Sequence, residues 1–171
     1  MLDRITRLVR HRWMDESTRI IDPAMLQRLA QQVSASEQRH TGEVRICVEA
    51  GLPNSYLLRP DPMHTLTRQR ALSQFGKLRV WDTEHNNGVL IYLLLAEHSI
   101  ELVADRGLNR HVAPQAWQEM VQRLGLALHD GRFEEGLTRA VAEVSAVLEQ
   151  HFPMGAGQSR PNELPDQPSL S

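Results

Sequence analysis

The stretch Asn86-Asn87-Gly88-Val89-Leu90-Ile91-Tyr92-Leu93-Leu94-Leu95 decides the fold of this chain. A short apolar run with β-branched and aromatic residues, bounded by polar residues, is typical of a strand buried on both faces. A second run, residues 100–105, alternates apolar and polar side chains after a short polar connection. This spacing predicts a β-hairpin, with the first run at the centre of a sheet.

The segment before the central run predicts a βαβ unit. Residues 43–50 alternate, with Val44, Ile46 and Val48 on one face, and helical spacing of apolar residues follows from Pro62 to about residue 76. A strand, a helix and a strand in sequence form parallel strands joined by a right-handed crossover. Apolar spacing predicts further helices over residues 23–37, from residue 114, and over residues 133–150.

Length and composition predict one domain with two different ends. A chain of 171 residues has room for one ordinary domain with its own core. We place a basic amphipathic segment at residues 1–21, an α/β domain at residues 22–153, and a disordered tail at residues 154–171. The tail is rich in glycine, serine and proline and has little apolar surface to bury.

Charge and hydropathy exclude several classes of protein. The formal net charge of −2 gives no field that would attract nucleic acid. The apolar run over residues 89–96 is far shorter than the ~20 residues that span a bilayer, and no secretory signal is recognisable. Cys47 is the single cysteine and is expected to be a small buried residue. We therefore expect a cytoplasmic protein without an internal disulfide.

The first 13 residues carry four arginines among apolar residues at helical spacing. A basic amphipathic helix can lie on an anionic membrane, which is one hypothesis for peripheral membrane contact. Such a helix more often packs on its own domain or frays, and this alternative is favoured.

Strand direction predicts a cluster of polar residues at one edge of the sheet. If the first two strands are parallel and the third is antiparallel, the starts of the first two and the end of the third meet. We call this edge the rim. The rim residues are His40, Gly42, Glu43, Thr83, His85, Asn86, Asn87, Gly88, Asp105, Arg106 and Gly107.

Carboxylate and amide oxygens at the rim fit a hard cation such as Ca²⁺ or Mg²⁺. The candidate ligands are Asp105, Glu43 and Asn87, while Arg106 has the chemistry to hold an anionic group such as phosphate. Gly88 and the other rim glycines would let backbone approach a ligand closely. The alternative is that these polar side chains only cap strand ends and turns.

The same residues resemble a known family. The matching segments are Glu37–Glu43, Asp82 to Tyr92, Glu101–Leu108, Gly131–Leu137 and His151–Pro153. Together they resemble the TPM-domain family, in its short bacterial branch, over roughly residues 24 to 153. The resemblance implies a three-layer α/β/α sandwich with a small mixed sheet, completed by two C-terminal helices.

The resemblance also implies functions. Plant thylakoid members are described as acid phosphatases, some members bind divalent metals, and others are auxiliary subunits of membrane assemblies. By position, the family's polar residues correspond to Thr83, Asn87, Gly88, Asp105 and Gly107, with His40, Gly42 and Glu43 in the bacterial branch. Asn86 departs from the family, since an arginine is expected there.

Two functions of different class remain open. The first is a binding or accessory module with a cation-binding cleft, which would dock a protein partner or a membrane-associated complex. The second is a metal-assisted phosphomonoester hydrolase, in which Asp105 holds the cation and Glu43 is a second ligand or general base. The first is preferred because it needs less special chemistry.

Overall fold

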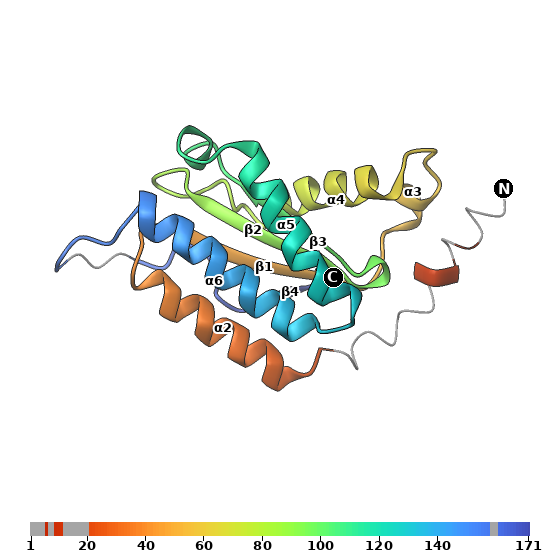
Figure 1. Cartoon of the computed structure of the whole chain (residues 1–171), viewed down its shortest axis with the longest axis horizontal. Coiled ribbons are helices and arrows are strands. Elements are labelled where there is room, and N and C mark those ends of the chain that lie inside the picture. The colour runs from red at the N-terminus through yellow and green to blue at the C-terminus, as the bar shows by residue number, and fades with distance from the viewer. Residues whose placement is uncertain (1–5, 7–8, 12–20, 158–160) are drawn as a thin grey trace.

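The sheet has four strands in the order β3-β2-β1-β4. The computed structural model describes residues 6, 9–11, 21–157 and 161–171 (Figure 1). β1 (Glu43–Glu49) is parallel to β2 (Gly88–Leu94) and to β4 (Ser169–Leu170), while β3 (Ser99–Ala104) is antiparallel to β2. The predicted parallel pair and hairpin are therefore confirmed, and β4 is an addition.

Helices cover both faces of this sheet. The helices of one layer are α2 (Pro23–Glu37), α5 (Pro114–His129) and α6 (Phe133–His151). The opposite layer holds α3 (Asn54–Leu57) and α4 (Met63–Lys77). Short 3-10 helices, η2 (Leu95–Glu97) and η3 (Leu108–Arg110), flank β3. The result is the predicted three-layer sandwich with a mixed sheet (Figure 1).

Local chemistry explains where α2 begins. The Asp22 side chain accepts a hydrogen bond from the backbone N–H of Met25 at 2.6 Å, and Pro23 occupies the first helical position. Both are standard N-terminal signals. The predicted range of residues 23–37 is confirmed.

The two faces of β1 differ in chemistry although all seven of its residues are buried. Val44, Ile46 and Val48 join the apolar cluster formed with α2, α5 and α6. The other face carries Glu43, Arg45, Cys47 and Glu49, of which Cys47 joins the cluster under α4. Buried charges are costly unless they are paired, so three ionisable residues on this face need partners.

Glu49 finds its partners in Arg70 of α4 and Tyr92 of β2. The Arg70 guanidinium donates through Nε to Glu49 Oε2 at 2.8 Å and through Nη2 to Oε1 at 2.5 Å. The Tyr92 hydroxyl donates to Oε2 at 2.6 Å. Burial and the Glu49 charge raise the pKa of Tyr92. This network joins α4 to the middle of the sheet.

Glu43 and Arg45 are paired by the C-terminal segment, residues 161–171. The Glu43 carboxylate accepts from the backbone N–H groups of Glu163 and Leu164 at 3.2 and 3.3 Å. The Arg45 guanidinium donates to the carbonyls of Pro165 and Gln167. Burial lowers the pKa of Arg45. The segment ends in β4, and the backbone N–H of the last residue donates to the Val48 carbonyl at 3.0 Å.

This segment differs from the predicted disordered tail. Its composition has few apolar residues, and Leu164 and Pro168 are the two residues that it buries. The segment is held instead by its backbone groups, which satisfy the buried charges of Glu43 and Arg45 and extend the sheet. Amino-acid composition shows how many apolar side chains a segment can bury. It does not show whether the backbone N–H and C=O groups of that segment will form hydrogen bonds with the rest of the chain.

Most of the basic N-terminal segment lies outside the described residues. Of the part described, His11 is 7% exposed. Its Nδ1 accepts from the backbone N–H of Leu52 at 3.0 Å, and its Nε2 lies 2.9 Å from Glu97 Oε1. His11 therefore packs on its own domain. In the described part of the chain, no helix combines the length and hydropathy needed to cross a membrane.

The buried network on Glu49 predicts a large effect on stability. Arg70→Ala should lower the free energy of unfolding by about 3–5 kcal/mol, because it leaves the Glu49 carboxylate buried and uncompensated. Urea denaturation measures the change. The control is Arg123→Ala, which removes an exposed ion pair to Glu143 and should cost less than about 1 kcal/mol. Similar losses in both variants would contradict this account.

The C-terminal segment predicts the reactivity of Cys47. The thiol is fully buried, and burial raises its pKa to about 11, so it should react slowly with a thiol reagent. Removing residues 161–171 takes away Ser171, which hydrogen-bonds to the thiol, and Leu164 of the same apolar cluster, and should accelerate labelling at least about tenfold. Leu170→Ala, at a half-exposed position, is the control and should label slowly. An unchanged rate after truncation would show that other parts of the chain protect the thiol.

Candidate functional site

The register places the three predicted segments at one rim. Glu43 is paired with Gly88 across β1 and β2. The Gly88 carbonyl in turn accepts from the backbone N–H of Asp105 at 2.9 Å, just beyond the end of β3. The starts of two strands and the end of the third therefore lie in one row, as strand direction predicted.

Asn87 is held by two threonines and has one unused oxygen. Its backbone N–H donates to Thr83 Oγ1 at 3.1 Å, and its side-chain Nδ2 donates to Thr41 Oγ1 at 3.3 Å. Asn87 is 1% exposed, and its Oδ1 has no hydrogen-bond partner among the described residues. A buried carbonyl oxygen without a donor is unusual and needs an explanation.

Asp105 has the same feature. Its Oδ1 accepts from the backbone N–H of Arg106 at 2.7 Å, whereas Oδ2 is buried and has no partner within the described part of the chain. Burial raises the pKa of the Asp105 carboxyl, although the Arg106 N–H and charge partly oppose the shift. An ionised Asp105 therefore costs free energy in this environment.

Glu43 and His40 lie at the rim but are engaged by the fold. Glu43 is fully buried, and both of its oxygens accept from the C-terminal segment as described above. His40 is also fully buried, its Nδ1 lies 3.0 Å from the Gly42 carbonyl, and its backbone forms a bridge with Pro153. Both residues therefore stabilise the fold through contacts with other parts of the chain.

Arg106 and Asn86 form a surface pair. The Arg106 guanidinium donates through Nε to Asn86 Oδ1 at 2.9 Å. Asn86 has a φ of 51°, which lies in the left-handed region where asparagine is among the most tolerated residues. This conformation explains why asparagine suits the position at which an arginine was expected. Arg106 remains exposed beside Asp105.

The rim glycines provide room for the protein's own backbone. A Cβ at Gly88 would collide with the Val80 carbonyl oxygen, and one at Gly107 would lie 2.5 Å from the Asn86 carbonyl oxygen. The close approach at Gly88 and Gly107 is thus to loops of the same chain, and contact of these glycines with a ligand stays a prediction. Among the described residues, no three His, Cys, Asp or Glu side chains are grouped to hold a metal ion.

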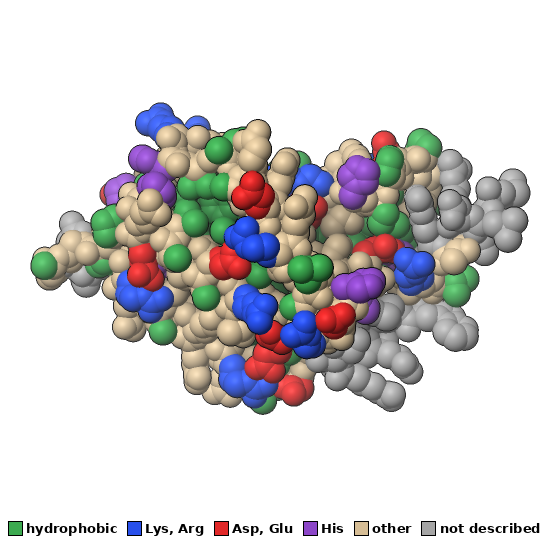
Figure 2. All heavy atoms as spheres, in the orientation of Figure 1, with side chains coloured by type: hydrophobic (Ala, Val, Ile, Leu, Met, Phe, Trp, Pro, Cys, Tyr) green, Lys and Arg blue, Asp and Glu red, His purple; other side chains and the backbone are tan. Residues whose placement is uncertain are grey.

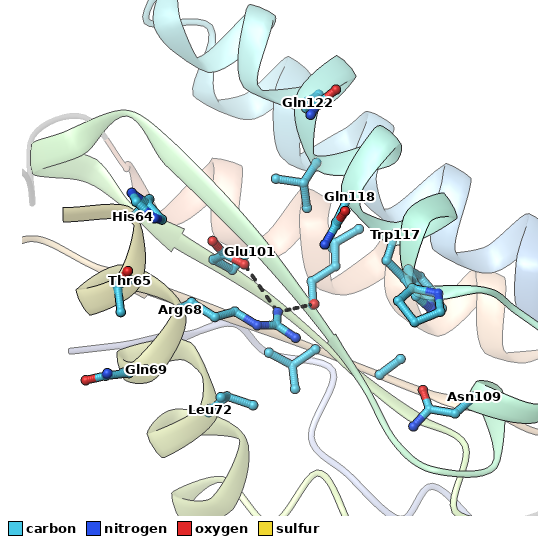
Figure 3. A pocket seen from close by; sticks show the side chains of 15 residues that line it. His64, Thr65, Arg68, Gln69, Leu72, Glu101, Asn109, Trp117, Gln118 and Gln122 are labelled. Atoms are coloured by element: carbon cyan, nitrogen blue, oxygen red, sulfur yellow. Dashed lines mark hydrogen bonds and ion pairs between the residues drawn. The ribbon is translucent and has the colours of Figure 1, made fainter. Parts of the chain in front are cut away.

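A second feature was not predicted from the sequence: a groove of about 850 Å³ between α4 and α5, which we call the β3 groove (Figure 3). Its base is the outer edge of β3, and Arg68 lies across it. Arg68 Nη1 donates to Glu101 Oε2 at 3.2 Å and to the Leu102 carbonyl at 2.7 Å. Burial raises the pKa of Glu101, opposed by the Arg68 charge.

The groove was missed because its walls come from opposite layers. His64, Arg68 and Leu72 lie on α4, whereas Trp117 and Val121 lie on α5. The sequence offers no signal for the groove, because the 48% exposure of the apolar Leu72 is seen only in the structure. On the face shown in Figure 2, the described basic and acidic side chains are interspersed. Arg28 and Glu134 are one of the ion pairs among the described residues.

Comparison with known proteins bears on fold and family. The NMR structure of the BA42 protein from the psychrophilic bacterium Bizionia argentinensis has a TM-score of 0.71 at 22% identity, covering 88% of this chain and 95% of that one. An N-terminal domain from P. gingivalis, also solved by NMR, has a TM-score of 0.52 at 18% identity, covering 80% and 83%. At these identities the likeness shows the fold alone.

No curated protein matches the chain. The model of the TPM domain family matches residues 14–147, which is well over half of the chain and includes every rim residue. The chain therefore belongs to the TPM domain family.

Proposed function

We propose that this TPM domain is a binding module that takes a divalent cation, Ca²⁺ or Mg²⁺, at the rim. The observation that carries the proposal is the pair of buried oxygens, Asn87 Oδ1 and Asp105 Oδ2, that have no hydrogen-bond partner among the described residues. A bound cation is a partner that such an oxygen can take. Hard cations prefer oxygen ligands of these two types.

The donor set determines the expected affinity. Ca²⁺ takes six to eight oxygen ligands, and Mg²⁺ keeps several waters. One carboxylate and one amide leave most of the coordination shell to water or backbone carbonyls. Weak binding follows, with dissociation constants of about 10⁻⁴–10⁻³ M. Glu43 is left out of the proposed site because the C-terminal segment already occupies its oxygens.

The accessory role is part of the same proposal. A domain that binds a cation weakly and catalyses no reaction can serve as an accessory subunit. Such a subunit would dock on a protein partner or on a membrane-associated complex. Docking on a membrane through residues 1–13 stays a prediction, since most of that segment lies outside the described residues.

The rim site predicts that cations stabilise the protein. Ca²⁺ or Mg²⁺ at ten times its dissociation constant should add about 1.4 kcal/mol to the free energy of unfolding, because the site exists only in the folded state. Asp105→Asn should abolish this response. It should not lower stability in chelator, since it removes a buried negative charge. Thermal unfolding with and without cation measures both effects.

The matched control is Asp82→Asn, which changes a half-exposed acid in the loop before β2 that pairs with Arg79. This variant should keep the cation response of the unchanged chain. Amide NMR during the titration should show shifts at Asn87 and Asp105. An equal thermal response in D105N and the unchanged chain would contradict the proposed site.

A second candidate is the metal-assisted hydrolysis of phosphomonoesters. The observation that favours it is the exposed guanidinium of Arg106, directly beside Asp105 and steadied by Asn86. A guanidinium can hold phosphate oxygens, while a cation at Asp105 would polarise the ester and activate water. Glu43 cannot serve as the general base while the C-terminal segment covers it, so water activation would depend on the cation.

This candidate predicts cation-dependent turnover of p-nitrophenyl phosphate. Asp105→Asn should remove the turnover, and Arg106→Ala should lower kcat/KM by about tenfold or more, because a charge-assisted contact to phosphate is lost. Asp82→Asn should leave the rate unchanged. Turnover that persists in D105N, or none with either cation, would eliminate hydrolysis and leave the binding module intact.

A further inference from the structure

At the base of the β3 groove lies the edge of β3 that has no neighbouring strand among the described residues, where Leu102 is 2% exposed and Ala104 is half-buried. The N–H of Asp105 points to β2, where it bonds to Gly88. Because successive residues of an antiparallel strand point their backbone groups to opposite sides, the N–H and C=O groups of Leu102 and Ala104 point away from β2. The bond from Arg68 to the Leu102 carbonyl confirms this direction.

The edge lies at the base of a groove and not on a flat surface. Residues Glu101 to Ala104 line it, with α4 on one side and α5 on the other (Figure 3). The walls combine the exposed apolar side chain of Leu72 with uncharged polar residues such as Gln118. The groove therefore offers backbone donors and acceptors at its base and mixed chemistry on its walls.

We propose that the β3 groove binds an extended peptide segment of a protein partner, which adds a strand to the free edge of β3. Outward N–H and C=O groups at alternate residues match the repeat of an extended backbone. The opposite edge of the same sheet is closed in this way by the chain itself, since β4 adds to β1 and its last residue bonds to Val48.

Arg68 defines the charge of the segment. Its side chain is 45% exposed, and both of its described hydrogen bonds use Nη1. Nε and Nη2 have no hydrogen-bond partner in the described part of the chain and are oriented by the Glu101 ion pair. This is the arrangement that receives a carboxylate, so the segment carries an acidic residue near Leu102. The Leu102 carbonyl can accept a second hydrogen bond without losing Arg68, because it has two lone pairs.

A second copy of this chain fits the groove less well than a single strand. Pairing two β3 edges would bring the α4 and α5 of one copy against those of the other before the strands could meet at hydrogen-bonding distance. A lone extended segment carries no flanking helices. The geometry therefore favours a peptide, and self-association becomes an outcome of the test.

The test selects a displayed library of random octapeptides against the full chain and measures the affinity of the enriched peptides after synthesis. We expect enriched peptides with an acidic residue, and amide NMR shifts at Leu72, Leu102 and Ala104. Leu72→Glu places a negative charge on the groove wall and should weaken binding about tenfold or more. Leu126→Glu is the matched control on α5, 72% exposed and outside the groove lining, and should leave affinity unchanged.

Strand addition is tested separately from contact with the walls. Ala104→Pro removes an outward N–H while leaving the Asp105 bond to β2, and proline is tolerated on edge strands, so it should also weaken binding about tenfold. N-methylation of the peptide nitrogens that face β3 should abolish binding, whereas N-methylation of the alternate nitrogens, which face away, should not. This test does not depend on whether the proline variant folds.

Three results would overturn the proposal. They are a library without enriched peptides, peptides that bind L72E as well as L126E, and a chain that elutes as a dimer disrupted by L72E. None of these depends on cation binding at the rim, so this test and that of the rim site fail independently.

Discussion

Three ionisable side chains on one face of β1 determine how the rest of the chain is arranged. Glu43, Arg45 and Glu49 lie under the second layer of the sandwich, in a strand whose every residue is buried. A charge in that environment is tolerated only with partners. α4 supplies Arg70 for Glu49, and the C-terminal segment supplies backbone groups for the other two. Residues 161–171 therefore lie against the first strand of the sheet.

The same constraint separates structure from function at the rim. Glu43 lies in the row that strand direction predicted, yet each of its oxygens already accepts a backbone hydrogen bond from the C-terminal segment. Asn87 and Asp105 are also buried, at 1% and 8% exposed, but each retains one oxygen without a donor among the described residues. Residues of similar chemistry at one rim thus have different tasks, and hydrogen-bond accounting distinguishes them where residue type does not.

Periodicity made most of the fold predictable from the sequence. The central apolar run, the alternation after Gly42 and the capped start at Asp22 are local signals, and each predicted element is present. Strand direction then predicted which distant residues share the rim. Two features depend on contacts without a local pattern: the C-terminal segment, held through its backbone, and the β3 groove, whose walls come from opposite layers. At the rim glycines, the sequence predicts that another group lies close to the backbone, but it does not show that loops of the same chain do so at Gly88 and Gly107.

The two edges of the sheet are protected by different means, and this difference determines which edge can bind a further strand. An exposed strand edge invites uncontrolled pairing, so proteins cover, shorten or charge their edges. Here β4 covers the edge of β1, whereas the edge of β3 is recessed between α4 and α5 and carries Arg68 on its Leu102 carbonyl. A recessed edge excludes another flanked sheet but can admit one extended chain. The arrangement that prevents aggregation at β3 is therefore also one that selects what can bind there.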